Sequence, residues 1–95
     1  MTPSRPREER LADQVERGIA AERLLGDELV QSWFAAEMTR ITEAMIGAPV
    51  SDDQTRRDCA VQLKQLRSLK AELEATAAQG RQAAKQQEKA QSHVY

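Results

Sequence analysis

The chain has 95 residues, of which 40% are hydrophobic and 31% charged, and its 14 basic residues nearly balance 15 acidic ones. This length suits one small domain with a modest core, and the near-neutral charge argues against a protein whose overall field attracts nucleic acid or an anionic membrane. The single cysteine, Cys59, excludes an internal disulfide and fits a reducing compartment, and no window approaches the run of about 18 apolar residues that spans a membrane.

The first predicted element is a helix over residues 7–25. Residues 1–6 contain two prolines and no apolar run, and we expect them to be flexible. An apolar stripe then crosses a charged segment at Leu11, Val15, Ile19 and Leu25. Gly26 can end this helix and Asp27 can cap the next one. Whether Gly26 breaks the helix or only bends it stays open, because a glycine inside a helix costs only about 1 kcal/mol.

The second predicted element is a helix over residues 28–46 with two apolar rows. One row follows the spacing of a buried face, at Val30, Phe34, Met38, Ile41 and Met45. A second row, rotated around the same helix, is formed by Leu29, Trp33 and Ala36. One neighbouring helix would not cover both rows. We therefore expect Trp33 to pack against the first helix or a second copy of the chain rather than to anchor a foreign protein.

The stretch IGAPVSDDQTRRD, residues 46–58, crowds carboxylates and arginines together and could be a site or a corner between helices. Gly47 in a left-handed conformation and Pro49 would end one helix. Ser51, followed three residues later by Gln54, has the spacing of a capping box that starts another. The two aspartates would then pair with arginines four residues on, Asp52 with Arg56 and Asp53 with Arg57. A cation site at these aspartates is disfavoured because adjacent helical side chains diverge.

The third predicted element is a long helix over residues 52–89. Its seam alternates steps of four and three, as in a coiled coil, at Cys59, Leu63, Leu66, Lys70, Leu73, Ala77 and Gly80. Leu69 lies beside this seam, and Cys59 is interpreted as a buried packing residue rather than a reactive thiol. Residues 80–95 have almost no large apolar side chain, so we expect a solvated, fraying extension in which His93 is a lone imidazole and not a ligand.

Together these elements predict an all-α fold: an elongated antiparallel hairpin of 28–46 and 52–89 within a domain over 7–79, preceded by the shorter helix 7–25. The two facing stripes of the hairpin leave apolar rows without cover, which predicts a coiled-coil-like homo-oligomer. We expect the interface with a second copy or a partner to use Leu29, Trp33, Leu63, Leu66, Leu69 and Leu73.

Several of these elements resemble a family of small proteins of tailed bacteriophages and prophages, to which no activity is securely attached. Its pattern comprises an Ala-x-x-Leu-Leu element, an Asp or Asn that opens a helix, an Asp-x-x-x-Arg corner, a leucine-rich helix and a late Gly-x-x-Ala. The matching residues are Ala21, Leu24, Leu25, Asp27, Asp53, Arg57, Leu63, Leu66, Leu73, Gly80 and Ala83. The match covers about two-thirds of the chain, and Glu28 stands where the family usually has proline. The resemblance implies a phage context and a helical hairpin, not a reaction.

We expect a non-enzymatic assembly protein that binds itself and a phage head, portal or packaging protein, in the bacterial cytoplasm, with incorporation into the virion left open. One alternative is a DNA-packaging factor like a small terminase subunit, but the second helix carries Asp27, Glu28, Glu37 and Glu43 against Arg40 alone. Weak, non-specific contact with nucleic acid would fall to Arg81, Lys85 and Lys89. Another alternative is an inhibitor or adaptor of a host protein. No catalytic, cofactor or metal residues are predicted.

Overall fold

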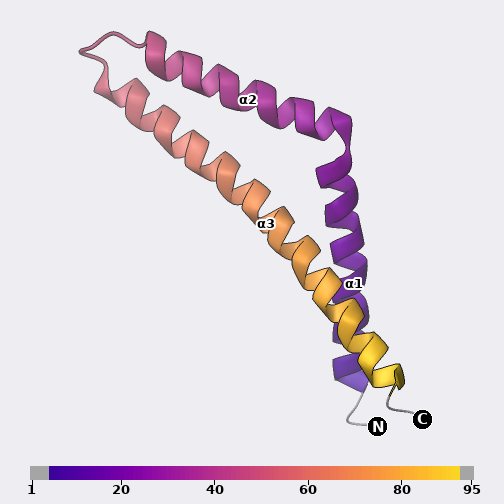
Figure 1. Ribbon diagram of the computed structural model, residues 1–95. Coiled ribbons are helices and arrows are strands. Elements are labelled where there is room, and N and C mark those ends of the chain that lie inside the picture. Colours follow the sequence, from indigo (N-terminus) through magenta and orange to yellow (C-terminus); the bar gives the residue numbers. More distant parts are fainter. Residues whose placement is uncertain (1–4, 93–95) are drawn as a thin grey trace. The chain divides into compact units, whose positions relative to one another are not determined.

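The computed structural model describes residues 5–92, and this part of the chain contains three helices and no strand. They are α1 (Arg5–Gly26), α2 (Glu28–Gly47) and α3 (Asp53–Ser92), shown in chain order in Figure 1. The all-α prediction is confirmed. Arg5 and Pro6, expected in a flexible N-terminus, belong to α1, whose first turn accommodates a proline because its N–H groups have no intrahelical partner. His93 lies outside the described residues.

The helices form two compact units that divide α3 between them. Unit 1 contains α1 up to Leu25 together with α3 from Leu73 onward, and unit 2 contains residues 26–72, which are α2 and the first part of α3. In each unit two helices run antiparallel (Figure 1). The helix pair of unit 2 is a hairpin, as the two facing stripes predict, but it uses α3 only to Glu72, and the part of α3 from Leu73 onward belongs to unit 1.

Unit 2 is built on large apolar side chains. Phe34 and Ile41 of α2 and Cys59 and Leu66 of α3 are buried there. The other members of the predicted inward row of α2 are half-buried, namely Val30, Met38 and Met45. The predicted buried face of α2 and the buried cysteine are therefore confirmed, and the period of 3.6 residues positions this face correctly along the whole helix.

Both ends of α2 are fixed by local chemistry. Asp27 is the N-cap, and its carboxylate accepts hydrogen bonds from the backbone N–H of Leu29 at 2.8 Å and of Val30 at 3.1 Å. The chain is therefore broken into two helices directly after Gly26, at the extended residue Asp27. At the other end, Ala48 has φ −67° and ψ 139°, the extended conformation that a following proline imposes. None of the glycines has a positive φ within residues 5–92, so the predicted left-handed Gly47 is wrong, and Pro49 ends the helix instead.

Unit 1 is held by small residues and a close approach of two backbones. Gly18 of α1 lies against Gly80 of α3, and a methyl group built on Gly18 would fall 2.6 Å from the Cα of Gly80. Three alanines are buried in the same unit: Ala21, Ala77 and Ala83. Because glycine has no side chain, the two helices approach more closely at this point than leucines would allow. The side chains of Glu22 and Arg81 also form an ion pair of 2.6 Å between the two helices.

This packing changes the interpretation of the residues from 80 onward. They continue α3 to Ser92, and Gly80 and Ala83 are buried rather than solvated as in the expected extension. At Gly80 a larger side chain has no room, because a Cβ there would lie 2.6 Å from the Cα of Gly18, so the small residue reflects a close neighbouring helix. The α3 seam thus extends past Ala77, through Gly80 and Ala83 to the half-buried Gln87.

Candidate functional site

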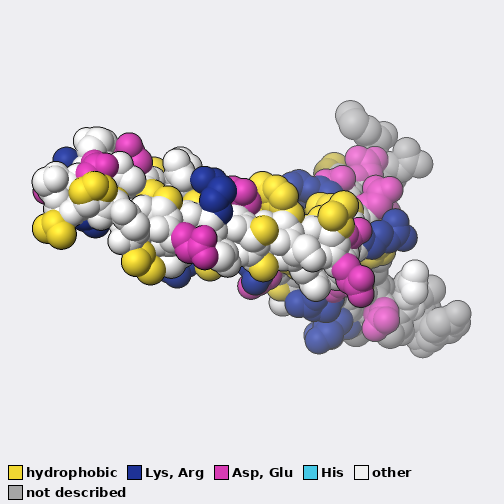
Figure 2. All heavy atoms as spheres, turned by 90° about the horizontal axis from the view of Figure 1, so that it is seen from above, with side chains coloured by type: hydrophobic (Ala, Val, Ile, Leu, Met, Phe, Trp, Pro, Cys, Tyr) yellow, Lys and Arg dark blue, Asp and Glu magenta, His cyan; other side chains and the backbone are white. Residues whose placement is uncertain are grey.

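An exposed apolar row of unit 2 lies on α2. We call Leu29, Trp33 and Ala36, with the flanking Glu28 and Glu43, the outer face of α2. Leu29 is 79% exposed and Trp33 is 51% exposed, whereas the inward row of the same helix is buried or half-buried. Figure 2 shows hydrophobic side chains between charged ones on the molecular surface that it presents. The outer face is the second row predicted from the sequence, and within unit 2 it stays exposed.

Trp33 is not a loose side chain. Its ring meets the ring of Phe34 edge to face, with centroids 5.3 Å apart and planes at 79°. This geometry is favourable for two aromatic rings, and Phe34 is itself buried. Trp33 is therefore held on a buried neighbour while half of its surface faces solvent. An aromatic side chain presented in this way loses little conformational entropy when another protein covers it.

An ion pair lies beside the outer face. Arg40 donates two hydrogen bonds to the carboxylate of Glu37, from Nε at 3.2 Å and from Nη2 at 2.9 Å. The hydrogen bond from Arg40 lowers the pKa of Glu37, and the same contact raises the pKa of Arg40. Glu28 and Glu43 differ from this pair, because within residues 5–92 neither of them forms an ion pair. These two carboxylates are available to a partner.

The other predicted interface residues have mixed positions. Leu66 is buried in unit 2, Leu63 and Leu73 are half-buried, and Leu69 is 47% exposed. The packing of the chain on itself therefore occupies Leu66 and much of Leu63 and Leu73. Only Leu29, Trp33 and Leu69 of the predicted set present large apolar surfaces to solvent. The sequence could not make this distinction, because a coiled-coil seam has the same spacing whether its partner is a helix of the same chain or of another copy.

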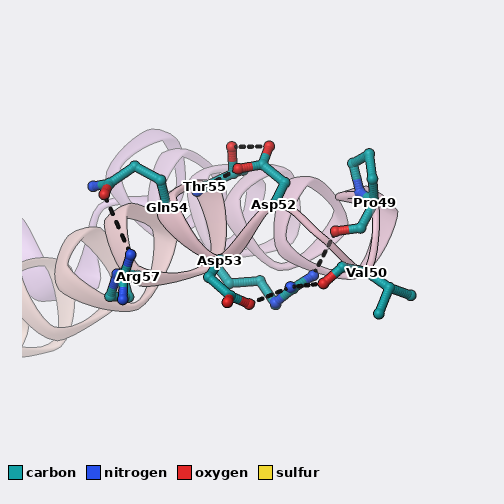
Figure 3. Close-up of polar contacts among 8 residues, drawn as sticks. Pro49, Val50, Asp52, Asp53, Gln54, Thr55 and Arg57 are labelled. Atoms are coloured by element: carbon teal, nitrogen blue, oxygen red, sulfur yellow. Dashed lines mark hydrogen bonds and ion pairs between the residues drawn. The ribbon is translucent and has the colours of Figure 1, made fainter.

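The crowded stretch before and within the start of α3 is a corner whose charges hold the backbone (Figure 3). Asp52, not Ser51, caps α3, because its carboxylate accepts from the Thr55 N–H at 3.1 Å and from the Thr55 hydroxyl at 2.6 Å. The Thr55 hydroxyl and then its N–H lower the pKa of Asp52. The predicted capping box at Ser51 and Gln54 is therefore wrong: two cap-forming residues stand next to each other, and the helix begins one residue later than that box requires.

Arg56 fastens this corner to the preceding loop. It pairs with Asp53 at 2.7 Å and donates to the carbonyl oxygens of Pro49, at 2.8 Å, and of Val50 (Figure 3). The predicted pairs of Asp52 with Arg56 and Asp53 with Arg57 are thus replaced by one pair three residues apart. Arg57 donates a long hydrogen bond to the side-chain oxygen of Gln54 at 3.5 Å. Arg56 also donates hydrogen bonds to the loop carbonyls, and residue spacing alone does not reveal these contacts.

The chemistry open to this corner is limited. Asp58 accepts a hydrogen bond from the Gln54 side chain at 2.8 Å, so each of the three aspartates here has a local structural partner. Within the described residues, no three histidine, cysteine or acidic side chains come together as a metal site would require. None of the described helices is both long and apolar enough to cross a membrane.

The three predicted nucleic-acid residues lie in unit 1 and differ in their surroundings. Arg81 is engaged by Glu22, while Lys85 and Lys89 are exposed on α3 and form no ion pair within residues 5–92. This leaves two cations where the sequence suggests three. A phosphate contact at Arg81 would first have to compete with the carboxylate of Glu22.

Comparisons with known proteins find no match for this chain among protein-family models, curated proteins or solved structures.

Proposed function

We propose that this protein is a non-enzymatic helical assembly protein that associates with further copies of itself through unit 2. The observation that carries this proposal is the outer face of α2, where Leu29 and Trp33 expose large apolar surfaces on an ordered helix. A row of this kind is typical of surfaces that another helix covers. The corner supports a structural role, because its charged side chains are used to hold the loop and cap α3.

The biological setting is part of the proposal and rests on the resemblance to small proteins of tailed phages and prophages. In that setting the protein would act in the cytoplasm of the bacterial host, and a head, portal or packaging protein would be its second partner. The charged side chains of α3 provide the polar surface for such a partner. Incorporation into the virion would follow if this second contact persists in the mature particle.

Self-association can be tested with the natural tryptophan as a reporter. Sedimentation velocity over the micromolar range should show a mass above that of one chain, increasing with concentration. Trp33 is the only tryptophan and is half exposed in a single chain, so its emission should shift to shorter wavelength as association covers it. A constant monomer mass and an emission maximum independent of concentration would contradict the proposal.

A matched pair of variants assigns the effect to the outer face. Leu29→Lys places a charge in the proposed contact and should shift the protein toward monomer without loss of helix content, because Leu29 is 79% exposed. Val61→Lys is the control: it adds the same charge at another exposed apolar residue of unit 2, on α3. Because Val61 lies one helical turn from Lys64, this control reports on added charge near that turn of α3, and it should not weaken association. Equal weakening by both variants would indicate a general charge effect instead of a specific interface.

A further inference from the structure

A groove between α2 and α3 in unit 2 lies away from the outer face. It is lined by Met45 of α2 and, on α3, by Ala60, Leu63, Lys64, Arg67 and Ala71. The alanines leave space, Met45 and Leu63 provide an apolar floor, and the two cations stand at its edge. This combination suits an amphipathic helix that brings apolar side chains to the floor and carboxylates to the edge.

The charges of the groove lack partners of their own. Lys64 and Arg67 are exposed, and within residues 5–92 neither forms an ion pair. Arg56 and Arg40 in the same unit, in contrast, each hold a carboxylate. Two neighbouring cations beside an apolar floor favour an acidic partner. A carboxylate placed between Lys64 and Arg67 attracts both of them and offsets the repulsion between the two positive charges.

The outer face of α2 has the complementary chemistry. Leu29 and Ala36 are apolar, and the carboxylates of Glu28 and Glu43 are exposed and without ion-pair partners among the described residues. Leu29 and Met45 lie about 160° apart around α2 at about 100° per residue, so the outer face and the groove point in different directions. One copy can therefore offer its outer face while its groove receives that of another.

We infer that the outer face of α2 from one copy docks into the groove of a second copy at Met45, Leu63, Lys64 and Arg67. This inference rests on the proposed self-association and names the surface that receives the outer face. The contact is heterologous, because the two surfaces that meet are different. Apolar side chains around Leu29 cover the floor, and Glu28, the neighbour of Leu29 on the outer face, supplies the negative charge that Lys64 and Arg67 attract.

The inference is tested by mixing two variants that are each defective in one surface. The groove variant, Lys64→Glu with Arg67→Glu, keeps an intact outer face, and the face variant, Leu29→Lys, keeps an intact groove. Each alone should associate at least about tenfold more weakly than the parent. Their mixture should form a 1:1 complex by sedimentation, because the intact face of the first fits the intact groove of the second. Circular dichroism of each variant establishes that the helices are retained.

Two controls make the result specific. Lys85→Glu with Lys89→Glu makes the same formal change in net charge on the unit 1 part of α3 and should associate like the parent. Raising the salt concentration should weaken parental association, because the proposed ion pairs lie at the edge of the groove. Association that is insensitive to salt would contradict a role for Lys64 and Arg67.

The outcomes separate this inference from the proposed function. If the groove variant associates like the parent while the face variant does not, the outer face binds elsewhere and the inference is overturned, whereas self-association stands. If both variants are weakened but their mixture stays monomeric, the docking of face into groove is also overturned. A monomeric parent would overturn both at the first measurement.

Discussion

Replacing Gly18 or Gly80 by alanine should destabilise unit 1, although alanine is the better helix former. A Cβ on Gly80 would lie 2.6 Å from the Cα of Gly18, 3.0 Å from the Gln14 carbonyl oxygen and 3.3 Å from the Gly18 nitrogen. A Cβ on Gly18 would meet the Gly80 Cα at 2.6 Å and the Thr76 carbonyl oxygen at 3.2 Å. All of these are backbone atoms, so no side chain can rotate away and the helices themselves must move apart.

The size of the effect follows from these distances. Carbon atoms in contact prefer a separation of about 3.5–4.0 Å, so the helices would have to separate by about 1 Å at the crossing. Forcing an extra methyl group into a packed contact costs about 1–3 kcal/mol, while the better helix propensity of alanine returns about 1 kcal/mol. The net loss in the free energy of unfolding should therefore lie between about zero and 2 kcal/mol for either single variant.

A control in which another glycine is replaced by alanine separates the steric effect from the better helix propensity of alanine. Gly26→Ala is suitable, because a Cβ on Gly26 meets nothing within 4 Å and its φ is not positive. Urea unfolding followed by circular dichroism, at one fixed protein concentration, should place Gly18→Ala and Gly80→Ala about 1–3 kcal/mol below Gly26→Ala. If all three alanine variants raised the unfolding midpoint equally, the close approach of the two backbones would be refuted.

Three further predictions concern the caps and the cations. Asp27→Ala should cost about 1 kcal/mol in the free energy of unfolding by urea titration, whereas Ser51→Ala should stay within about 0.5 kcal/mol, and the reverse order would contradict the caps seen here. Because hydrogen bonds from Thr55 lower the pKa of Asp52 in the folded chain, its contribution to stability is present above its ordinary pKa of about 3.9 and is lost as the pH falls through the lower folded value. Unfolding titrations below about pH 5 should therefore show a smaller loss for Asp52→Asn than for the parent, and parallel curves would exclude this contribution. Any DNA binding should be indifferent to sequence, weaken steeply with salt in a gel-shift titration and fall when Lys85 and Lys89 become Gln, while a sequence-selective complex that survives this change would favour the packaging factor.

DNA binding has to be tested by substituting Lys85 and Lys89, because deleting residues 80–95 would disturb the packing of unit 1. Deleting residues 80–95 would remove Gly80 and Ala83, which are buried in unit 1, and would also break the pair of Arg81 with Glu22. A truncated chain would lose the packing of α1 together with the two lysines, so a loss of binding would have two explanations. Lys85 and Lys89 are exposed, and replacing them leaves this packing in place.

The features that depend on a single local rule, such as helical periodicity or capping, were predictable from the sequence. The inward row at Phe34 and Ile41 depends only on helical periodicity, and the Asp27 cap depends only on an aspartate that follows a glycine between two periodic segments. The exposed row at Leu29 and Trp33 follows from the same periodicity, because one helix face cannot hold both rows. These features are local, and the sequence contains all the information that they need.

Features that depend on competition or on distant contacts were not predictable. Ser51 and Asp52 can both cap a helix, and Asp52 does so here with an additional hydrogen bond from the hydroxyl of Thr55. The bonds from Arg56 to the loop carbonyls are a second contact that residue spacing does not reveal. In the sequence alone, Gly18 and Gly80 each appear only to weaken a helix. The structure shows their role, because the absence of both side chains lets the two backbones approach closely. The spacing of Gly18 with Ala21, and of Ala77 with Gly80 and Ala83, was the available signal, since small residues three apart share one helix face.

The side chains along the α3 seam explain why we expect a second copy to bind unit 2. In unit 2 the buried seam residues are Cys59 and Leu66, and the buried residues of α2 are Phe34 and Ile41. Lys64 and Arg67 line the groove of this unit. In unit 1 the seam carries glycine and alanine against Gly18 and Ala21, which brings the backbones together. The groove of that unit is lined by alanines and four glutamines, Gln14, Gln79, Gln82 and Gln86. Uncharged amides give the carboxylates of the outer face no net attraction, whereas the two cations of unit 2 do, so charge selects the groove of unit 2.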